Sequence, residues 1–204
     1  MRESKIVRNV IVTIHGIRKG DTMKALRGLI KRDECFSDYV IETLDYGYVY
    51  AIVNYIPILR SITAKLVASF LHRIQYQYPH ANVTVLAHSN GTWAIGRALE
   101  TWKEKSPFFY IHKLQKLLLF GSVLKRNFDW NRFENIEVTN FVSANDKVVL
   151  FAKPFYGMGW SGRYGFKTDA PNLRQIQIDT GHTGFLAEYD IIRNVVFDKY
   201  KWLN

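Results

Sequence analysis

The chain has 204 residues, of which 48% are hydrophobic and 23% are charged, and this balance suits one globular domain with a buried core rather than a disordered or collagen-like chain. Its single cysteine, Cys35, cannot form an internal disulfide and excludes a cysteine-based metal site. Lysine and arginine number 28 against 18 aspartate and glutamate residues, a net charge of +10, which favours an anionic partner such as a membrane surface, nucleic acid or an acidic substrate.

Short β-branched segments alternate along the chain with longer segments of helical periodicity, a pattern typical of a parallel sheet built from β-α-β units. In chain order, the sequence predicts strands at residues 10–14, 39–44, 83–87, 117–120, 138–142 and 173–178. The spacing of apolar residues predicts helices at residues 21–32, 59–78, 92–102 and 185–203. Because no repeat or linker separates these elements, we expect one α/β domain over residues 1–204.

The longest nearly apolar stretch, residues 46–59, is shorter than the ~20 residues that a membrane-spanning helix needs. The first residues lack the hydrophobic region and cleavage site of a secretory signal peptide, so we expect a cytoplasmic protein. The sequence contains no HExxH, EF-hand, Walker A or GxGxxG motif and no recognisable nucleic-acid-binding module. We therefore expect no cofactor, no metal and no nucleic-acid partner.

The segment AHSNG, residues 87–91, connects a predicted strand directly to a predicted helix and has Ser89 at its centre. Such a turn is so tight that the residues two before and two after the serine must be small, while the serine is strained and exposed. The segment resembles the nucleophile elbow of the α/β-hydrolase family, with Ala87 in place of the usual first glycine and Thr92 where many members have a smaller residue. The alternative is that Ser89 only caps the following helix.

Three further features carry the resemblance to this family. The segment IHGI, residues 14–17, ends the first strand where the family has an HG turn, which implies that the N–H groups of Ile17 and Asn90 form an oxyanion hole. Asp146 follows the fifth strand and His182 the sixth, where the family carries its acid and its base. The chain order Ser89, Asp146, His182 is that of α/β-hydrolases and differs from the orders of chymotrypsin and subtilisin.

Other residues compete for these roles. Asp129 is the rival acid, because some hydrolases take the acid from the loop after the preceding strand, and Asp179 is expected only to shape the loop before the base. His15 is expected to pack or hydrogen-bond within the HG turn, and His88 to point into the environment of the sheet.

The resemblance implies a minimal six-stranded, mostly parallel α/β-hydrolase sheet with helices on both faces and no separate cap domain, as in small lipases and cutinase-like enzymes. It implies a serine esterase without a cofactor, acting on a small-molecule or lipid ester. The net charge of +10 adds an anionic membrane surface as a candidate partner. Aromatic and apolar segments beside the site predict substrate contacts from His15, Tyr48, Val148 and Phe155. A thioesterase or acyltransferase, or a non-catalytic protein that binds lipid, nucleic acid or another protein, remains the alternative, and the oligomeric state stays open.

Overall fold

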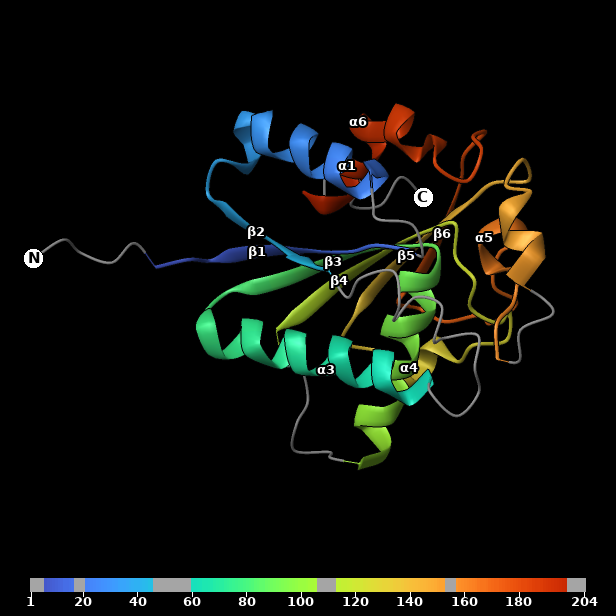
Figure 1. Ribbon diagram of the computed structural model, residues 1–204, viewed down its shortest axis with the longest axis horizontal. Coiled ribbons are helices and arrows are strands. Elements are labelled where there is room, and N and C mark those ends of the chain that lie inside the picture. The colour runs from blue at the N-terminus through green and yellow to red at the C-terminus, as the bar shows by residue number, and fades with distance from the viewer. Residues whose placement is uncertain (1–5, 17–20, 46–59, 106–112, 153–156, 198–204) are drawn as a thin grey trace, which may run out of the picture.

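The computed structural model describes residues 6–16, 21–45, 60–105, 113–152 and 157–197 (Figure 1). Six strands form one sheet in the order β2-β1-β3-β4-β5-β6. Every pair of neighbouring strands is parallel. The strands are β1 (Asn9–Ile14), β2 (Tyr39–Leu44), β3 (Asn82–His88), β4 (Leu114–Phe120), β5 (Glu137–Val142) and β6 (Leu173–Gln177). The prediction of a six-stranded parallel sheet is therefore confirmed.

Helices cover both faces of this sheet (Figure 1). Helices α1 (Asp21–Arg32) and α6 (Tyr189–Val196) lie on one face, and α3 (Arg60–Gln77) and α4 (Asn90–Lys105) lie on the other. Helix α1 illustrates how the sequence pattern places these helices on the sheet. Met23, Leu26 and Ile30 recur at intervals of three and four residues, so they lie on one side of the helix, and all three are buried. No helix in the described part of the chain is long and apolar enough to cross a membrane.

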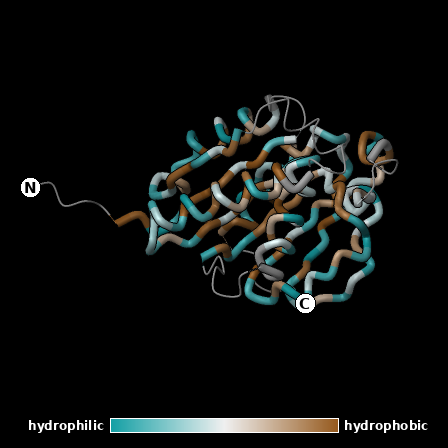
Figure 2. Tube along the Cα trace, turned by 60° about the horizontal axis from the view of Figure 1, so that its bottom comes forward, coloured by the Kyte–Doolittle hydropathy of each residue, from teal (hydrophilic) through white to brown (hydrophobic). Residues whose placement is uncertain are grey.

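The central strands are apolar on both sides because both sides are covered. In β1, Val10, Val12 and Ile14 belong to the hydrophobic cluster with α3 and α4, whereas Ile11 belongs to the cluster with α1 and α6. Figure 2 shows hydrophobic residues recurring along the strands in the middle of the molecule. Strand β6 differs, since it lies at the edge of the sheet: Leu173 and Ile176 are partly buried, whereas Arg174, Gln175 and Gln177 are exposed.

An aromatic cluster fills the space beside β4 and β5, where the connection contains only the 3-10 helix η2 (Trp130–Phe133). Trp130 is fully buried and contacts Phe128 and Phe166, with ring centroids 4.5 and 5.5 Å apart. The carboxylate of Asp129 caps η2 by accepting a hydrogen bond from the backbone N–H of Asn131 at 3.2 Å.

The prediction of one continuous helix over residues 185–203 is wrong at its start. A 3-10 helix, η4 (Gly184–Glu188), precedes α6, which begins only at Tyr189. This turn directs Phe185 into the core, where its ring centroid lies 4.4 Å from that of Phe120. The described helix ends at Val196, and residues 198–204 lie outside the described part. Besides η4, four short elements were not predicted: η1 (Glu34–Phe36), η2, η3 (Val148–Ala152) and α5 (Ser161–Tyr164).

Candidate active site

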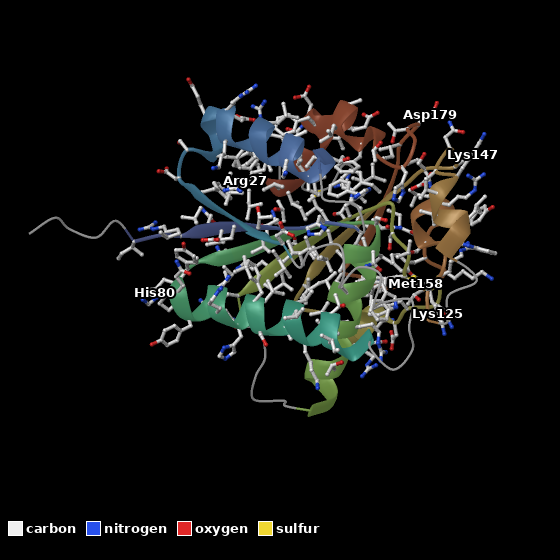
Figure 3. All side chains as sticks on the ribbon, in the orientation of Figure 1. Arg27, His80, Lys125, Lys147, Met158 and Asp179 are labelled. Carbon is white, nitrogen blue, oxygen red and sulfur yellow. The ribbon has the colours of Figure 1, made fainter. Side chains whose placement is uncertain are left out.

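The carboxyl ends of parallel strands meet at one edge of a sheet, and three predicted site residues lie at this edge. Ser89 follows β3, Asp146 follows β5 and His182 follows β6. Figure 3 labels Lys147 and Asp179 in the loops after β5 and β6 at one end of the molecule, and His80, which precedes β3, at the opposite end. The strand order thus gathers the loops that carry the candidate acid, base and nucleophile.

Ser89 sits in a strained turn between β3 and α4. Among the described residues, it is the non-glycine residue whose φ is positive, at 54°, a conformation that costs of order 1–3 kcal/mol. Its N–H donates to the Phe120 carbonyl at 2.9 Å, and its carbonyl accepts from the Thr92 hydroxyl at 2.6 Å. A residue that caps a helix has an extended backbone, so this geometry disfavours the capping interpretation and fits the elbow.

The two glycines near Ser89 explain why the turn needs small residues. A side chain at Gly91 would place its Cβ 2.7 Å from the His15 carbonyl oxygen, so α4 could not start this close to the end of β1. A Cβ at Gly16 would lie 2.8 Å from the Ser89 Cβ and 3.3 Å from its Oγ. The HG turn and the serine side chain are therefore in direct proximity.

Asp146 and His182 form a hydrogen-bonded pair. The His182 Nδ1 lies 2.8 Å from the Asp146 Oδ2, and the Asp146 side chain is almost fully buried. The other carboxylate oxygen accepts from the backbone N–H groups of Val148 and Val149 at 3.1 and 3.2 Å. Because an ionised carboxylate only accepts, Nδ1 carries the proton and Nε2 is left to accept one. This tautomer is the one that a general base requires.

Further contacts join the acid loop to the base loop. The Ser143 hydroxyl donates to the Thr180 carbonyl, and the Asn145 amide donates to the Asp179 carboxylate. Asp179 thus contacts the acid loop, as expected of a residue that shapes the base loop. Asp129, the rival acid, is exposed, and its carboxylate accepts hydrogen bonds from Asn131. The histidine that the acid would orient, His182, is bonded to Asp146 instead.

Gly121 is a site residue that the sequence analysis missed. It follows β4 with φ of +53°, and a Cβ there would lie 2.7 Å from the His182 Nδ1 and 3.1 Å from the Asp146 Oδ2. Its neighbour Phe120 accepts the hydrogen bond of the Ser89 N–H, so Ser89 and His182 flank the same point of β4. Among the described residues, no hydrogen bond joins these two side chains, and such contacts often tighten only when substrate binds. The available signal was a glycine at the end of a central strand.

Two histidines lie beside the candidate triad. His88 is buried and its Nε2 lies 3.0 Å from the His182 carbonyl oxygen; burial, followed by the charge of His182, lowers the pKa of His88 to about 3. His15 is also buried, with Nδ1 at 2.5 Å from the Gly16 carbonyl oxygen and Nε2 at 3.2 Å from Asp45 Oδ1. Both ring nitrogens of His15 are occupied within the protein, so the prediction that it contacts substrate gains no support from these contacts.

The remaining predicted residues divide by position. Val148 is 51% exposed, two residues after Asp146, and its contact with substrate stays a prediction. The side chain of Asn90 is buried, and neither of its amide atoms has a hydrogen-bond partner within the described structure. Ile17, Tyr48 and Phe155 lie outside the described residues.

Comparisons with known proteins agree on the architecture. A family model described as "Alpha/beta hydrolase of unknown function (DUF900)" matches residues 60–153. Among solved structures, an acetylxylan esterase is 12% identical, covers 97% of this chain and 99% of its own, and has a TM-score of 0.55. A cutinase-like protein from Cryptococcus sp. is 13% identical, with 94% of each chain covered and a TM-score of 0.51. Human thioesterase 2 is 12% identical, covers 93% of this chain and 94% of its own, and has a TM-score of 0.54. No curated protein sequence matches the chain. At these identities the likeness concerns the fold.

Proposed function

This chain has the α/β-hydrolase fold, and from that premise we propose that it is a serine hydrolase that cleaves a carboxylic ester. Ser89 is the nucleophile, His182 the general base and Asp146 the acid that orients the base. The observation that supports this most is the 2.8 Å hydrogen bond between Asp146 and the His182 Nδ1, at the same sheet edge as a serine with φ of 54°.

In the proposed cycle, the Ser89 Oγ attacks the ester carbonyl carbon while the His182 Nε2 takes the hydroxyl proton. The carbonyl oxygen becomes negative and accepts hydrogen bonds from the N–H groups of Ile17 and Asn90. Collapse of this intermediate breaks the bond to the alkoxy group, which leaves as an alcohol with the proton from His182. Water then attacks the acyl-serine by the reverse sequence and releases the carboxylic acid, so Ser89 returns to its starting state.

The surface beside the acid favours an apolar group on the substrate. Val148 and Leu150 are 51% and 37% exposed although both are aliphatic, and they follow Asp146 in the 3-10 helix η3. An apolar acyl or alkyl part would cover these side chains and remove them from water.

A thioester is the second candidate substrate, because the triad and oxyanion hole serve either leaving group. The observation that favours it is the similarity in fold to human thioesterase 2. Comparing turnover of matched oxygen esters and thioesters of graded acyl length distinguishes the two, since the preferred leaving group gives the higher kcat/KM.

A fluorophosphonate probe tests the proposal, because it reacts only with an activated serine. We expect stoichiometric labelling of the wild-type protein, loss of labelling in Ser89→Ala, and unchanged labelling in the control Ser37→Ala. Ser37 is exposed at the end of η1. Labelling of Ser89→Ala at the wild-type level would place the nucleophile elsewhere. No labelling of the wild-type protein would favour a non-catalytic binding protein.

A further inference from the structure

His88 is the residue before Ser89, and its side chain reaches the loop that carries the candidate base. The His88 Nε2 lies 3.0 Å from the carbonyl oxygen of His182. The two imidazole rings are 4.7 Å apart between centroids, and the ring of Phe185 lies 5.2 Å from that of His88 on the same side of the sheet. Although 94 residues separate them in sequence, His88 and His182 therefore share a hydrogen bond and a ring contact.

The chemistry of this hydrogen bond assigns the proton on His88. A carbonyl oxygen only accepts, so the His88 Nε2 must carry the hydrogen. His88 is buried, and burial together with the charge of His182 lowers its pKa to about 3. The groups that face it are His182, Asp146 and His15. The bond to the His182 carbonyl and the charge of Asp146 favour the charged form of His88, whereas the charges of the two histidines oppose it, and burial is the largest effect. His88 is consequently a neutral, fixed donor, and it neither gives nor takes a proton at neutral pH.

The hydrogen bond from His88 goes to the main chain of His182, whereas the bond from Asp146 goes to its side chain. Asp146 holds the imidazole at Nδ1 through a single hydrogen bond. The backbone around it forms the turn from Gly181 to Gly184, in which the Gly184 N–H donates to the Gly181 carbonyl at 3.0 Å. Gly181 is exposed, and no atom of the described residues lies within 4 Å of its Cβ position. The bond from His88 connects this turn to the end of β3.

We propose that His88 is a positioning residue, which ties the main chain of the base His182 to the strand that carries the nucleophile Ser89. The inference rests on the function proposed above. Because His88 and Ser89 are consecutive residues at the end of β3, a bond from His88 to the base loop links nucleophile and base through one rigid element. Since His88 is neutral, it also does not repel the imidazolium that forms when His182 takes the serine proton.

Two substitutions separate the donor from the ring. His88→Gln keeps an N–H donor near the position of Nε2, whereas His88→Phe keeps a ring of similar size without a donor. We expect His88→Phe to lower kcat, and the rate of fluorophosphonate labelling, by about 10–100-fold with KM within about threefold of wild type, since misplacing a catalytic group by ~1 Å costs about 100-fold. His88→Gln should recover most of this loss.

The control is Phe36→Leu, a change to a buried ring at the end of η1 in the hydrophobic cluster that also contains Phe185. It should reduce thermal stability while leaving kcat unchanged, which separates loss of packing from loss of positioning. Wild-type kcat in His88→Phe, or equal losses in the Gln and Phe variants, would overturn the inference. If the wild-type protein takes no probe at all, the proposed function fails first; if it does and His88→Phe reacts at the wild-type rate, only the positioning role fails.

A second measurement needs neither activity nor a stable variant. Nitrogen-15 NMR of the histidine-labelled wild-type protein should show His88 as the Nε2–H tautomer, with no titration between pH 5 and pH 8. Protonation of His88 within that range, or the Nδ1–H tautomer, would contradict a fixed donor to the His182 carbonyl.

Discussion

At the scale of single residues, both carboxylate oxygens and the backbone carbonyl oxygen of Asp146 accept hydrogen bonds. Its carboxylate accepts from His182, Val148 and Val149. Its backbone carbonyl accepts from the Arg163 guanidinium at 3.2 Å. A carboxylate held at both oxygens has one orientation, and it imposes that orientation on the imidazole bonded to it.

We predict that Asp146→Asn lowers kcat by on the order of 10²–10⁴, because an amide at this position can favour the wrong tautomer of His182. Asp129→Asn, the matched change at the rival position, should leave kcat within about threefold, since Asp129 is exposed and caps η2. Steady-state hydrolysis of a chromogenic ester measures both. A larger loss in Asp129→Asn than in Asp146→Asn would move the acid to the earlier loop.

A second prediction concerns Gly121. Gly121→Ala introduces a Cβ 2.7 Å from the His182 ring in a backbone with φ of +53°, so the imidazole must move away from Asp146. We expect kcat to fall at least tenfold. Gly28→Ala in α1 is the control, since nothing lies within 4 Å of its Cβ position, and alanine in a helix interior is favoured over glycine by roughly 0.5–1 kcal/mol. Equal kcat in the two variants would show that a Cβ at position 121 does not displace the His182 ring.

At the scale of elements, a polar cluster joins the end of α1 to α6. The Asp33 carboxylate accepts from the Tyr189 hydroxyl at 3.1 Å and lies 3.4 Å from the Arg193 Nε. It also accepts from the backbone N–H of Cys35 at 3.0 Å. Burial alone would raise the pKa of Asp33, but these hydrogen bonds and the charge of Arg193 together lower it below 3.8. The cluster therefore stabilises the fold more when Asp33 is ionised than when it is protonated.

We predict that Asp33→Asn lowers the free energy of unfolding at pH 7 by about 1 kcal/mol or less, because the pair is near the surface. A carboxyl whose pKa is lowered in the folded state adds stability that is fully present above the unfolded value of about 3.8 and is lost as pH falls through the folded value. The difference between variant and wild type should thus shrink below about pH 4. Urea unfolding at several pH values measures it, and a difference that grows on acidification would contradict the assignment.

The elements also show what local sequence can predict. The central strands β1, β3, β4 and β5 are apolar and buried, because burial on both faces leaves a local pattern. Helix α5 left none: the Gly162 N–H donates to the Ser122 carbonyl at 2.7 Å, and its carbonyl accepts from the Ser143 N–H at 2.8 Å. These partners lie 19 and 40 residues away in sequence, so no short window of sequence contains both ends of the contact.

The same distinction applies to the candidate site. Ser89, Asp146 and His182 could be proposed from their places after strands, and their catalytic roles stay predictions. Gly121 and His88 could not, because their importance depends on how closely β4 and the base loop approach in space. Ile17, Tyr48 and Phe155 lie outside the described residues, so their predicted roles are untested.

At the scale of the whole molecule, the net charge is +10. Some of the basic side chains lie beside exposed apolar and aromatic residues near the candidate site. Tyr164 is 47% exposed, and the guanidinium groups of Arg126 and Arg163 lie 5.7 and 5.4 Å from its ring centroid. Val148 is 51% exposed, and the neighbouring Lys147 is exposed as well. We propose that this surface associates with anionic lipid.

Cosedimentation with anionic vesicles should therefore weaken as salt rises, because the screening length falls from ~8 Å at physiological ionic strength to ~3 Å at 1 M. The rate of hydrolysis of a short soluble ester should change little over the same range, since salt hardly screens interactions between partly buried groups that lie within a few ångströms. Zwitterionic vesicles provide the control. Equal binding to the two kinds of vesicle, or none to either, would leave the charge without a role at membranes.

The position of β6 has a consequence for how activity would be lost. Within the described part of the chain, β6 pairs only with β5, and three of its five residues are exposed. In contrast β3, the strand before Ser89, pairs with β1 and with β4. Edge segments open at a lower free energy than the global unfolding of a domain. A transient detachment of β6 would carry His182 away from an elbow that is still intact. In mild denaturant, hydrolytic activity should then be lost at a lower concentration than the circular dichroism signal of the fold. The amide protons of β6 should also exchange with solvent sooner than those of β3.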